Sequence, residues 1–302
     1  MSDQTQDWES GHQKRCRHNR QRARLFAASR MLFCLFLVVF CISSCLLIGR
    51  TYRGWKEEKA FSDLHSLIQN PSSDDSDSDS PDPSNPDSDD DVPATAGTSF
   101  HPEHPQFDEN GVLVKYSKVY ARNPDLYGWI SIDGTELNYP VMRTPEDEEF
   151  YLRRDFDKKY SRSGVPFIDV DCTPEGMNHI VYGHNMLNGT MFSLLESYQH
   201  EDFWREHPVI HFDTIYEEAE YEVMAAFYTR VFNQNETDVF RYYYYEDLSD
   251  PQDYEDYVNW MSNMSQIDTG IEAEYGDDLL TLITCSYGFE AQRFVVLARK
   301  CK

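Results

Sequence analysis

Apolar and polar positions alternate in short runs along the chain from about residue 107 onward. Two of these runs, LYGWISI and TELNYPVM, flank Asp133-Gly134. An Asp-Gly pair between alternating runs favours a two-residue β-hairpin turn. The series continues with GVPFIDV, HIVYG, VIHFD, YEVMAAFYTRVF, LLTLITC and RFVVLARK. About eight strands with few helices predict a mainly β domain, and closure into an antiparallel-rich barrel removes its sheet edges.

Two segments carry apolar residues at helical spacing instead. The first covers residues 111–123 and stops before Pro124, so an N-terminal helix is expected there. The second covers residues 250–265, where Asp250 is a candidate N-cap and Pro251 takes the first helical position. Its apolar face consists of Tyr254, Tyr257, Val258 and Met261. This helix precedes the LLTLITC strand and is expected to cover the barrel wall.

A long uncharged apolar run, MLFCLFLVVFCISSCLLI, stands near the N-terminus at residues 31–48. Its length suits a hydrocarbon core of ~30 Å. The strongly basic flank before it places the N-terminus in the cytoplasm by the positive-inside rule. A cleaved signal peptide is the alternative, but its apolar core usually has ~7–15 residues, and no small-x-small site follows here. We therefore expect a cytoplasmic tail (1–30), a single transmembrane anchor (31–49) and an extracellular remainder.

The extracellular remainder begins with a strongly biased segment. Residues 71–93 are almost entirely Asp, Ser and Pro. Such a composition cannot bury apolar area, and its like charges extend the chain, so residues 50–106 are expected to be a linker with a disordered spacer. Residues 107–302 then form one globular domain. The formal net charge of the whole chain is -26, which excludes a nucleic-acid-binding surface.

The seven cysteines divide between these regions. Only Cys172, Cys285 and Cys301 lie in the globular domain, and no Cys-x-x-Cys or Cys/His spacing indicates a zinc site. An odd number leaves at least one of them free. Cys172 and Cys301 could form a disulfide outside the cell and leave Cys285 free. The other four lie in or before the apolar run: Cys16, Cys34, Cys41 and Cys45.

Three side chains that can carry chemistry stand at strand ends. Cys285 ends the LLTLITC run, His184 follows HIVY after Gly183, and Arg293 opens the strand after Cys285. They supply a nucleophile, a proton carrier and an anion stabiliser. A free cysteine can also pack as a small hydrophobe, so an inert core role for Cys285 stays open at this point.

These motifs resemble those of sortases, the membrane-anchored cysteine transpeptidases of Gram-positive bacteria. The signature is TLITC followed eight positions later by the arginine of RFVVLARK. Class B is the most similar, through NPDLYGWISIDGTELNYPVMRTPEDEEFYLRRDF, GVPFIDVDC, HIVYGHNM and a helix before the cysteine strand. The resemblance covers residues 107–300 and implies a closed eight-stranded sortase-like barrel with 107–302 as the catalytic domain.

The resemblance also implies the roles of individual residues. Cys285 is the nucleophile, His184 the general acid/base and Arg293 the stabilising cation. His179 begins its strand instead of following the Tyr-Gly turn, so we interpret it as structural, because a base must reach the reacting group. The residues matching the peptide groove of class B are Asn138, Met142 and Tyr182.

The expected reaction and partners follow from this resemblance. The Cys285 thiolate attacks the carbonyl after a Thr in the C-terminal sorting motif of a secreted protein, and a thioester forms. An amine of a lipid-linked peptidoglycan precursor or of a pilin then resolves the thioester at the plasma membrane. The scheme needs no metal and no organic cofactor.

Two other functions remain open from the residues alone. A cell-wall cysteine hydrolase or L,D-transpeptidase also pairs Cys with His, although TCSYGF lacks the Gly-Cys-Ile/Val-Arg run typical of the latter. A non-catalytic, membrane-tethered adhesion barrel would use Cys285 only as a core residue.

Overall fold

The computed structural model describes residues 37–45, 48–49, 56, 58–69, 105–288 and 291–302. The chain divides into two units, Met1–Ala60 and Phe61–Lys302. In the first unit, residues 37–45 are helical and mostly exposed. Within the described ranges, no helix combines the length and apolar character needed to cross a membrane.

Several expected segments fall wholly or partly outside the described residues. The cytoplasmic tail (1–30) and the acidic spacer (71–93) lie outside them entirely. Of the expected anchor, residues 31–36 and 46–47 are not described. The anchor, the tail and the spacer therefore stay predictions.

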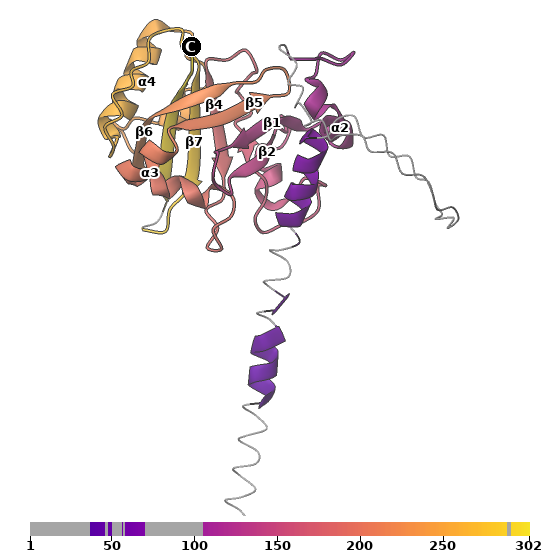
Figure 1. Cartoon of the computed structure of the whole chain (residues 1–302). Helices are drawn as coiled ribbons and strands as arrows, with labels where there is room; N and C mark the ends of the chain where they lie inside the picture. The colour runs from indigo at the N-terminus through magenta and orange to yellow at the C-terminus, as the bar shows by residue number, and fades with distance from the viewer. Residues whose placement is uncertain (1–36, 46–47, 50–55, 57, 70–104, 289–290) are drawn as a thin grey trace, which may run out of the picture. The chain divides into compact units, whose positions relative to one another are not determined.

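In the second unit, the described residues form eight strands in one sheet (Figure 1). The order is β1-β2-β3-β4-β7-β8-β6-β5, and β5 pairs back onto β1, so the sheet closes on itself. The mainly β, eight-stranded architecture expected from the sequence is confirmed. The strands are β1 (Leu126–Ser131), β2 (Asn138–Met142), β3 (Phe167–Ile168), β4 (Asn178–Gly183), β5 (Val209–Thr214), β6 (Glu220–Arg230), β7 (Leu279–Cys285) and β8 (Gln292–Lys300).

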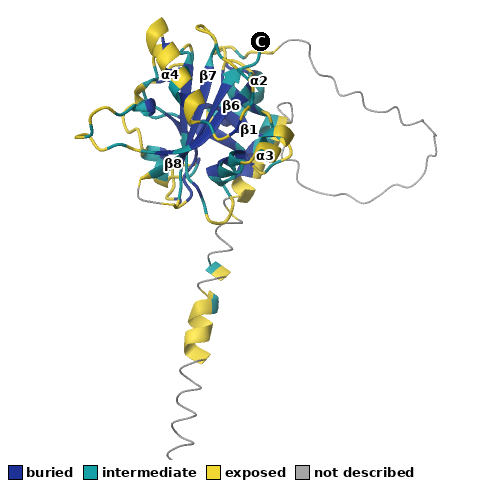
Figure 2. Cartoon of the chain, turned by 90° about the vertical axis from the view of Figure 1, so that its left-hand side faces the viewer, coloured by how far each residue is buried: buried dark blue, intermediate teal, exposed yellow. Residues whose placement is uncertain are grey.

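Closure depends on a close approach of β1 and β5. Gly128 lies opposite Thr214 in this ladder, and a Cβ atom on Gly128 would come within 2.0 Å of the main-chain oxygen of Asp213. Only glycine fits there, because any side chain would push the two strands apart. Alternating side chains of the strands fill the buried interior, which Figure 2 shows in dark blue at the centre of the unit.

The first hairpin differs from the two-residue turn expected at Asp133-Gly134. β1 and β2 do pair, but the connection spans residues 132–137. The main-chain N–H of Ile132 donates to the Leu137 carbonyl at 3.0 Å, and that of Thr135 donates to the Ile132 carbonyl at 3.2 Å. Gly134 has a φ of 75° within this inner turn. The glycine is therefore needed for its left-handed conformation, as the pattern indicated, but in a longer loop.

Both predicted helices of the domain form. They are α2 (Val114–Arg122) and α4 (Pro251–Met264). Oδ1 of Asp250 caps α4 by accepting from the main-chain N–H of Gln252 at 2.8 Å and of Asp253 at 3.3 Å. The buried face of α4 carries Tyr257, whose hydroxyl lies 2.8 Å from Oγ1 of Thr281 on β7. The other helices are α3 (Glu201–Glu206), η1 (Phe150–Arg153), η2 (Phe192–Gln199) and η3 (Tyr242–Tyr244).

The compact unit begins earlier than the predicted boundary at residue 107. Residues 58–69 are helical, and Phe61 and Leu64 are buried. The ring of Phe61 contacts that of Tyr139 with centroids 5.2 Å apart. The apolar positions 61, 64, 67 and 68 are spaced as on one helix face. Through this face, part of the segment expected to be a linker packs against the hydrophobic core of the domain.

The disulfide that Cys172 and Cys301 could form is absent, and both thiols are free. Cys172 is buried, and its Sγ lies 3.3 Å from the main-chain oxygen of Asn178 and 3.3 Å from the main-chain nitrogen of Ile180. Burial raises the pKa of the Cys172 thiol to about 12. This thiol is therefore a satisfied core group and not half of a bridge.

Candidate active site

Strand pairing brings the three candidate catalytic residues together. β7 lies between β4 and β8, and Cys285 pairs directly with Arg293 across the antiparallel β7–β8 ladder. The β4–β7 ladder is parallel and ends at Gly183 opposite Thr284. His184 follows Gly183 and Cys285 follows Thr284, so each residue comes one position after the last β4–β7 pair. The register therefore pairs Cys285 with Arg293 and puts His184 and Cys285 after the same end of that ladder.

The side chains of Cys285 and Arg293 point to the outer face of the barrel wall. Thr281 contacts Tyr257 of the outer helix α4, and Cys285 lies on the same face of β7 because side chains alternate. His179 points into the barrel, where its ring contacts that of Phe212. His184 is five positions after His179 and directly follows β4, so alternation continued by one residue would turn it to the outer face. Arg293, which lies directly opposite Cys285 on β8, has its side chain on the same face of the sheet as Cys285.

The residues around His184 determine its orientation. A Cβ atom on Gly183 would come within 2.5 Å of the Phe192 ring, so glycine is needed before the histidine. Nε2 of His184 lies 2.8 Å from the Leu152 carbonyl oxygen. A carbonyl only accepts, so Nε2 carries the proton and Nδ1 is the nitrogen that can take one. Burial lowers the pKa of His184, with a smaller lowering from Arg153, against the opposing effect of the Leu152 hydrogen bond.

Cys285 and Arg293 are both half-buried, which leaves them accessible at the strand ends. Nη1 of Arg293 donates to the Gln292 carbonyl at 3.0 Å. Across the described part of the chain, Arg293 forms no ion pair with any residue. Its remaining donors can therefore bind a developing negative charge, as an oxyanion requires. Among the three cysteines of the domain, Cys285 is the one that is paired with Arg293 in the sheet.

Sequence reasoning missed an aromatic wall beside this site. Tyr242 is fully buried, and its ring stacks on Trp260 of α4 at 5.8 Å. Its hydroxyl has no hydrogen-bond partner among the described residues. Burial raises the pKa of Tyr242, against a smaller lowering by the charge of Arg293. The run of four tyrosines at 242–245 was the available signal.

The three expected groove residues have different surroundings. Tyr182 is half-buried two positions before His184, and its hydroxyl donates to Asp169 at 3.0 Å. Met142 is fully buried. Asn138 accepts a hydrogen bond of 2.5 Å from Nε1 of Trp129. Tyr182 therefore lies on β4 just before His184, whereas Asn138 lines a separate pocket and Met142 is enclosed in the core.

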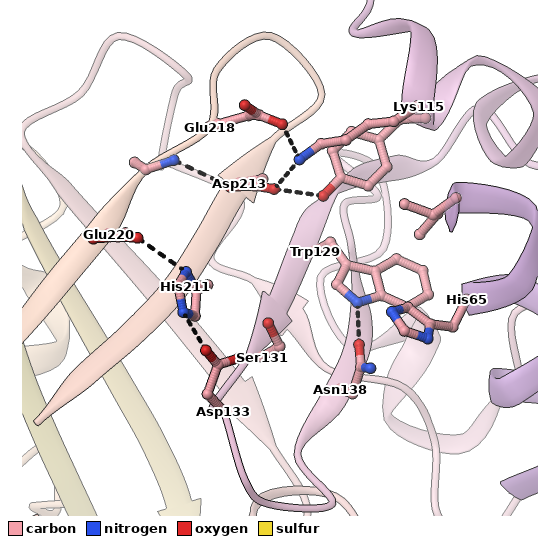
Figure 3. Close-up of a pocket in the computed structure, with 13 residues that line it drawn as sticks. His65, Lys115, Trp129, Ser131, Asp133, Asn138, His211, Asp213, Glu218 and Glu220 are labelled. Carbon is pink, nitrogen blue, oxygen red and sulfur yellow. Dashed lines mark hydrogen bonds and ion pairs between the residues drawn. The ribbon is translucent and has the colours of Figure 1, made fainter. Parts of the chain in front are cut away.

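Asn138 belongs to a pocket of about 780 Å³ on another part of the barrel wall (Figure 3). Here Asp213 accepts from Lys115 at 2.7 Å, from the Tyr116 hydroxyl at 2.7 Å and from the Ala219 main chain at 3.1 Å. The pocket centres on β1, which is four strands from β7 in either direction around the barrel. It contains no cysteine, so we do not assign the reaction to it. Its other lining residues are His65, Ile68, Trp129, Ser131, Asp133, His211, Glu218 and Glu220.

Two other histidines of the domain, His179 and His211, have structural surroundings. His179 is buried, with Nδ1 3.1 Å from the Tyr127 hydroxyl, and burial lowers its pKa to about 4. This agrees with its interpretation as structural. His211 lies on the outer face of β5 between the carboxylates of Asp133 at 3.4 Å and Glu220 at 3.6 Å.

One cluster within the described residues has the geometry to hold a metal ion. Asp169, Asp171 and Glu246 offer carboxylate oxygens within 4.8 Å of one another. Asp169 already accepts from Tyr182, and burial followed by the charges of its two neighbours raises the pKa of Glu246. Nothing in this arrangement supplies a step that the thiol, imidazole and guanidinium lack.

Comparison with known proteins identifies one family. The sortase domain family matches residues 130–301. Sortase B of Staphylococcus aureus (strain NCTC 8325 / PS 47) is 32% identical over 208 residues, which covers 68% of this chain and 79% of that protein. Sortase B of Listeria monocytogenes serovar 1/2a is 30% identical over 178 residues, 58% of this chain and 69% of that protein.

Solved structures agree with these sequence matches. A Staphylococcus aureus sortase B-substrate complex superposes with a TM-score of 0.57 at 30% identity, covering 63% of this chain and 86% of that one. Sortase B of Clostridium perfringens gives a TM-score of 0.55 at 30% identity, covering 61% of this chain and 98% of that one.

Proposed function

Because this chain belongs to the sortase family, in class B, and is therefore a cysteine transpeptidase, we propose that Cys285, His184 and Arg293 carry out its reaction. One observation supports the proposal: β7, which ends at Cys285, is the middle one of three adjacent strands, with Arg293 opposite Cys285 on β8 and His184 directly after the end of β4. The adhesion and L,D-transpeptidase alternatives do not account for this arrangement together with the family match.

The first half-reaction cleaves a sorting motif. Nδ1 of His184 takes the Cys285 proton, and the thiolate forms a bond to the carbonyl carbon of a Thr in the substrate peptide. Arg293 stabilises the negative charge that develops on the carbonyl oxygen. The peptide C–N bond then breaks, His184 returns the proton to the leaving amine, and a thioester remains on Cys285.

The second half-reaction transfers the peptide. An amine attacks the thioester carbonyl, gives its proton to His184 and displaces the thiolate, so that a new amide bond forms. The proposed substrates are secreted proteins with a C-terminal sorting motif. The proposed acceptor is the amine of a lipid-linked peptidoglycan precursor or of a pilin.

We place this reaction on the outer face of the plasma membrane. The support is the apolar run at 31–48 with its basic N-terminal flank, which favours a single span and a cytoplasmic N-terminus. Of the expected groove residues, Tyr182 is supported as a peptide contact by its place beside His184. The surroundings of Asn138 and Met142 do not support that role.

Mass spectrometry of the purified protein with candidate sorting peptides tests the proposal. We expect an acyl adduct on Cys285, cleavage after Thr and, when an amine is added, a transferred product. Cys285→Ala serves as the control and should give none of these. Cleavage without transfer to any amine would indicate a hydrolase, and the absence of both adduct and cleavage would contradict the enzymatic role.

A further inference from the structure

The connection after the nucleophile carries one side chain with an unusual setting. Tyr287, two residues beyond Cys285, is 63% exposed, so its ring adds little to the core. Its hydroxyl nevertheless donates a short hydrogen bond to the main-chain oxygen of Asn185, the residue after His184. A single side chain thus joins the segment of the nucleophile to the segment of the base.

Both ends of this bond are well supported. Asn185 is buried and pairs with Met191 in an isolated bridge. On the other side, the main-chain N–H of Ser286 donates to the Gln292 carbonyl at 3.0 Å. The hydroxyl of Tyr287 therefore links two segments that are each anchored to the barrel.

The bond lies where the sheet itself no longer links these two segments. The β4–β7 ladder ends at Gly183 and Thr284, and Oγ1 of Thr284 donates to the Gly183 carbonyl at 2.8 Å. His184 and Cys285 are the next residues on each strand, beyond the last paired position. Without strand pairing, their separation depends on contacts made by the loops that follow.

We propose that Tyr287 is a positioning residue that sets the separation between Cys285 and His184. This inference rests on the proposed roles of those two residues. Proton transfer needs its two heavy atoms within about 2.6–3.2 Å of each other. Loss of the Tyr287 hydroxyl frees the two loops to separate, so the thiol loses its proton to the imidazole less readily.

The test compares Tyr287→Phe with Tyr275→Phe in the full-length protein. Tyr275 is a matched control, because it is 54% exposed and its hydroxyl also donates to a main-chain oxygen, that of Ser249, at 2.7 Å. Steady-state cleavage of a sorting peptide is measured first. We expect Tyr287→Phe to lower kcat about tenfold with KM within about twofold, and Tyr275→Phe to match the wild type.

A second readout needs no sorting peptide. The rate of Cys285 alkylation by iodoacetamide is measured against pH, with Cys285→Ala as background. We expect Tyr287→Phe to shift the pH of half-maximal rate upward, because a less well placed imidazole promotes thiolate formation less. An effect of Tyr287 on folding alone would lower the melting temperature without moving this pH.

The outcomes separate the two proposals. If Tyr287→Phe keeps both the wild-type kcat and the wild-type alkylation profile, Tyr287 is not a positioning residue, even though the enzyme works. The same holds if only Tyr287→Ala is impaired, because the ring and not the hydroxyl would then matter. If the wild type cleaves no sorting peptide, the proposed function fails, and the alkylation profile still decides the role of Tyr287.

Discussion

Two parts of the barrel wall, the strand ends around Cys285 and the pocket over β1 and β5, use polar side chains in opposite ways. In the pocket, Asp213 receives three hydrogen bonds and its charge is matched by Lys115 (Figure 3). Beside Cys285, Arg293 forms no ion pair with a described residue, and the buried Tyr242 hydroxyl has no described partner. The hydrogen bonds in the pocket fasten α2 to the sheet. At the strand ends, the half-buried guanidinium of Arg293 has no carboxylate partner among the described residues, which suits the role proposed for it.

The largest expected effect distinguishes two cysteines of the same domain. Cys285→Ala should abolish acylation and transfer, because no other group near His184 can form the thioester. Cys172→Ala should keep activity but lose about 1–3 kcal/mol of stability, since the Ile180 N–H loses its partner. Peptide cleavage and urea unfolding measure the two effects. If the Cys285→Ala protein were active, Cys285 would not be the nucleophile, and the two cysteines would not differ in function.

The next effect separates two arginines of β8. Arg293→Lys keeps the charge but loses the planar fork, so we expect kcat to fall on the order of 10²–10³. Arg299, which pairs with Glu222 at 3.0 Å, is the control, and Arg299→Lys should leave kcat unchanged. Steady-state kinetics of the two variants measure both values of kcat. Equal losses would mean that the strand, and not the site, is sensitive to the substitution.

The third effect concerns the histidine inside the barrel. The folded pKa of His179 is about 4, below the ordinary 6.5, so between these values the unfolded chain binds a proton that the folded protein excludes. Its contribution is complete above pH 6.5 and is lost as the pH falls toward 4, which costs about 3 kcal/mol. Urea unfolding at pH 7 and pH 4 should show a smaller pH effect for His179→Gln than for the wild type.

The exposed residue His200 provides the control for this pH effect. His200→Gln should retain the full loss of stability on acidification. If His179→Gln and His200→Gln depend on pH equally, then His179 is not the group that excludes the proton.

The smallest effect tests the pocket itself. Asp213→Asn should cost about 2 kcal/mol in stability, because Lys115 and the buried Tyr116 hydroxyl both lose a charged acceptor, although Glu218 still pairs with Lys115. Activity should not change. Asp202, whose side chain is 96% exposed and lies 3.7 Å from Arg205, gives the matched control, and Asp202→Asn should leave the melting temperature unchanged. A loss of activity in Asp213→Asn would connect the pocket to the reaction.

Local patterns in the sequence were sufficient to predict much of this molecule. Alternation of apolar residues located the strands, and Asp250 with Pro251 located the start of α4, because strand faces and helix caps depend on near neighbours. The positions of Cys285 and His184 at strand ends were visible for the same reason. The stripe at 61–69 was also present in the sequence but was hidden within a segment that looked like a linker.

Only the tertiary structure decided which strands lie side by side. His184 and Cys285 are far apart in the chain, and the parallel pairing of β4 and β7, with Gly183 opposite Thr284, brings the segments that carry them to the same end of the sheet. Closure of the sheet also decided that His179 faces inward, that Asn138 faces a separate pocket and that Cys172 is buried away from any disulfide. Alternation predicts that a strand has two faces, but the strand order determines what each face meets.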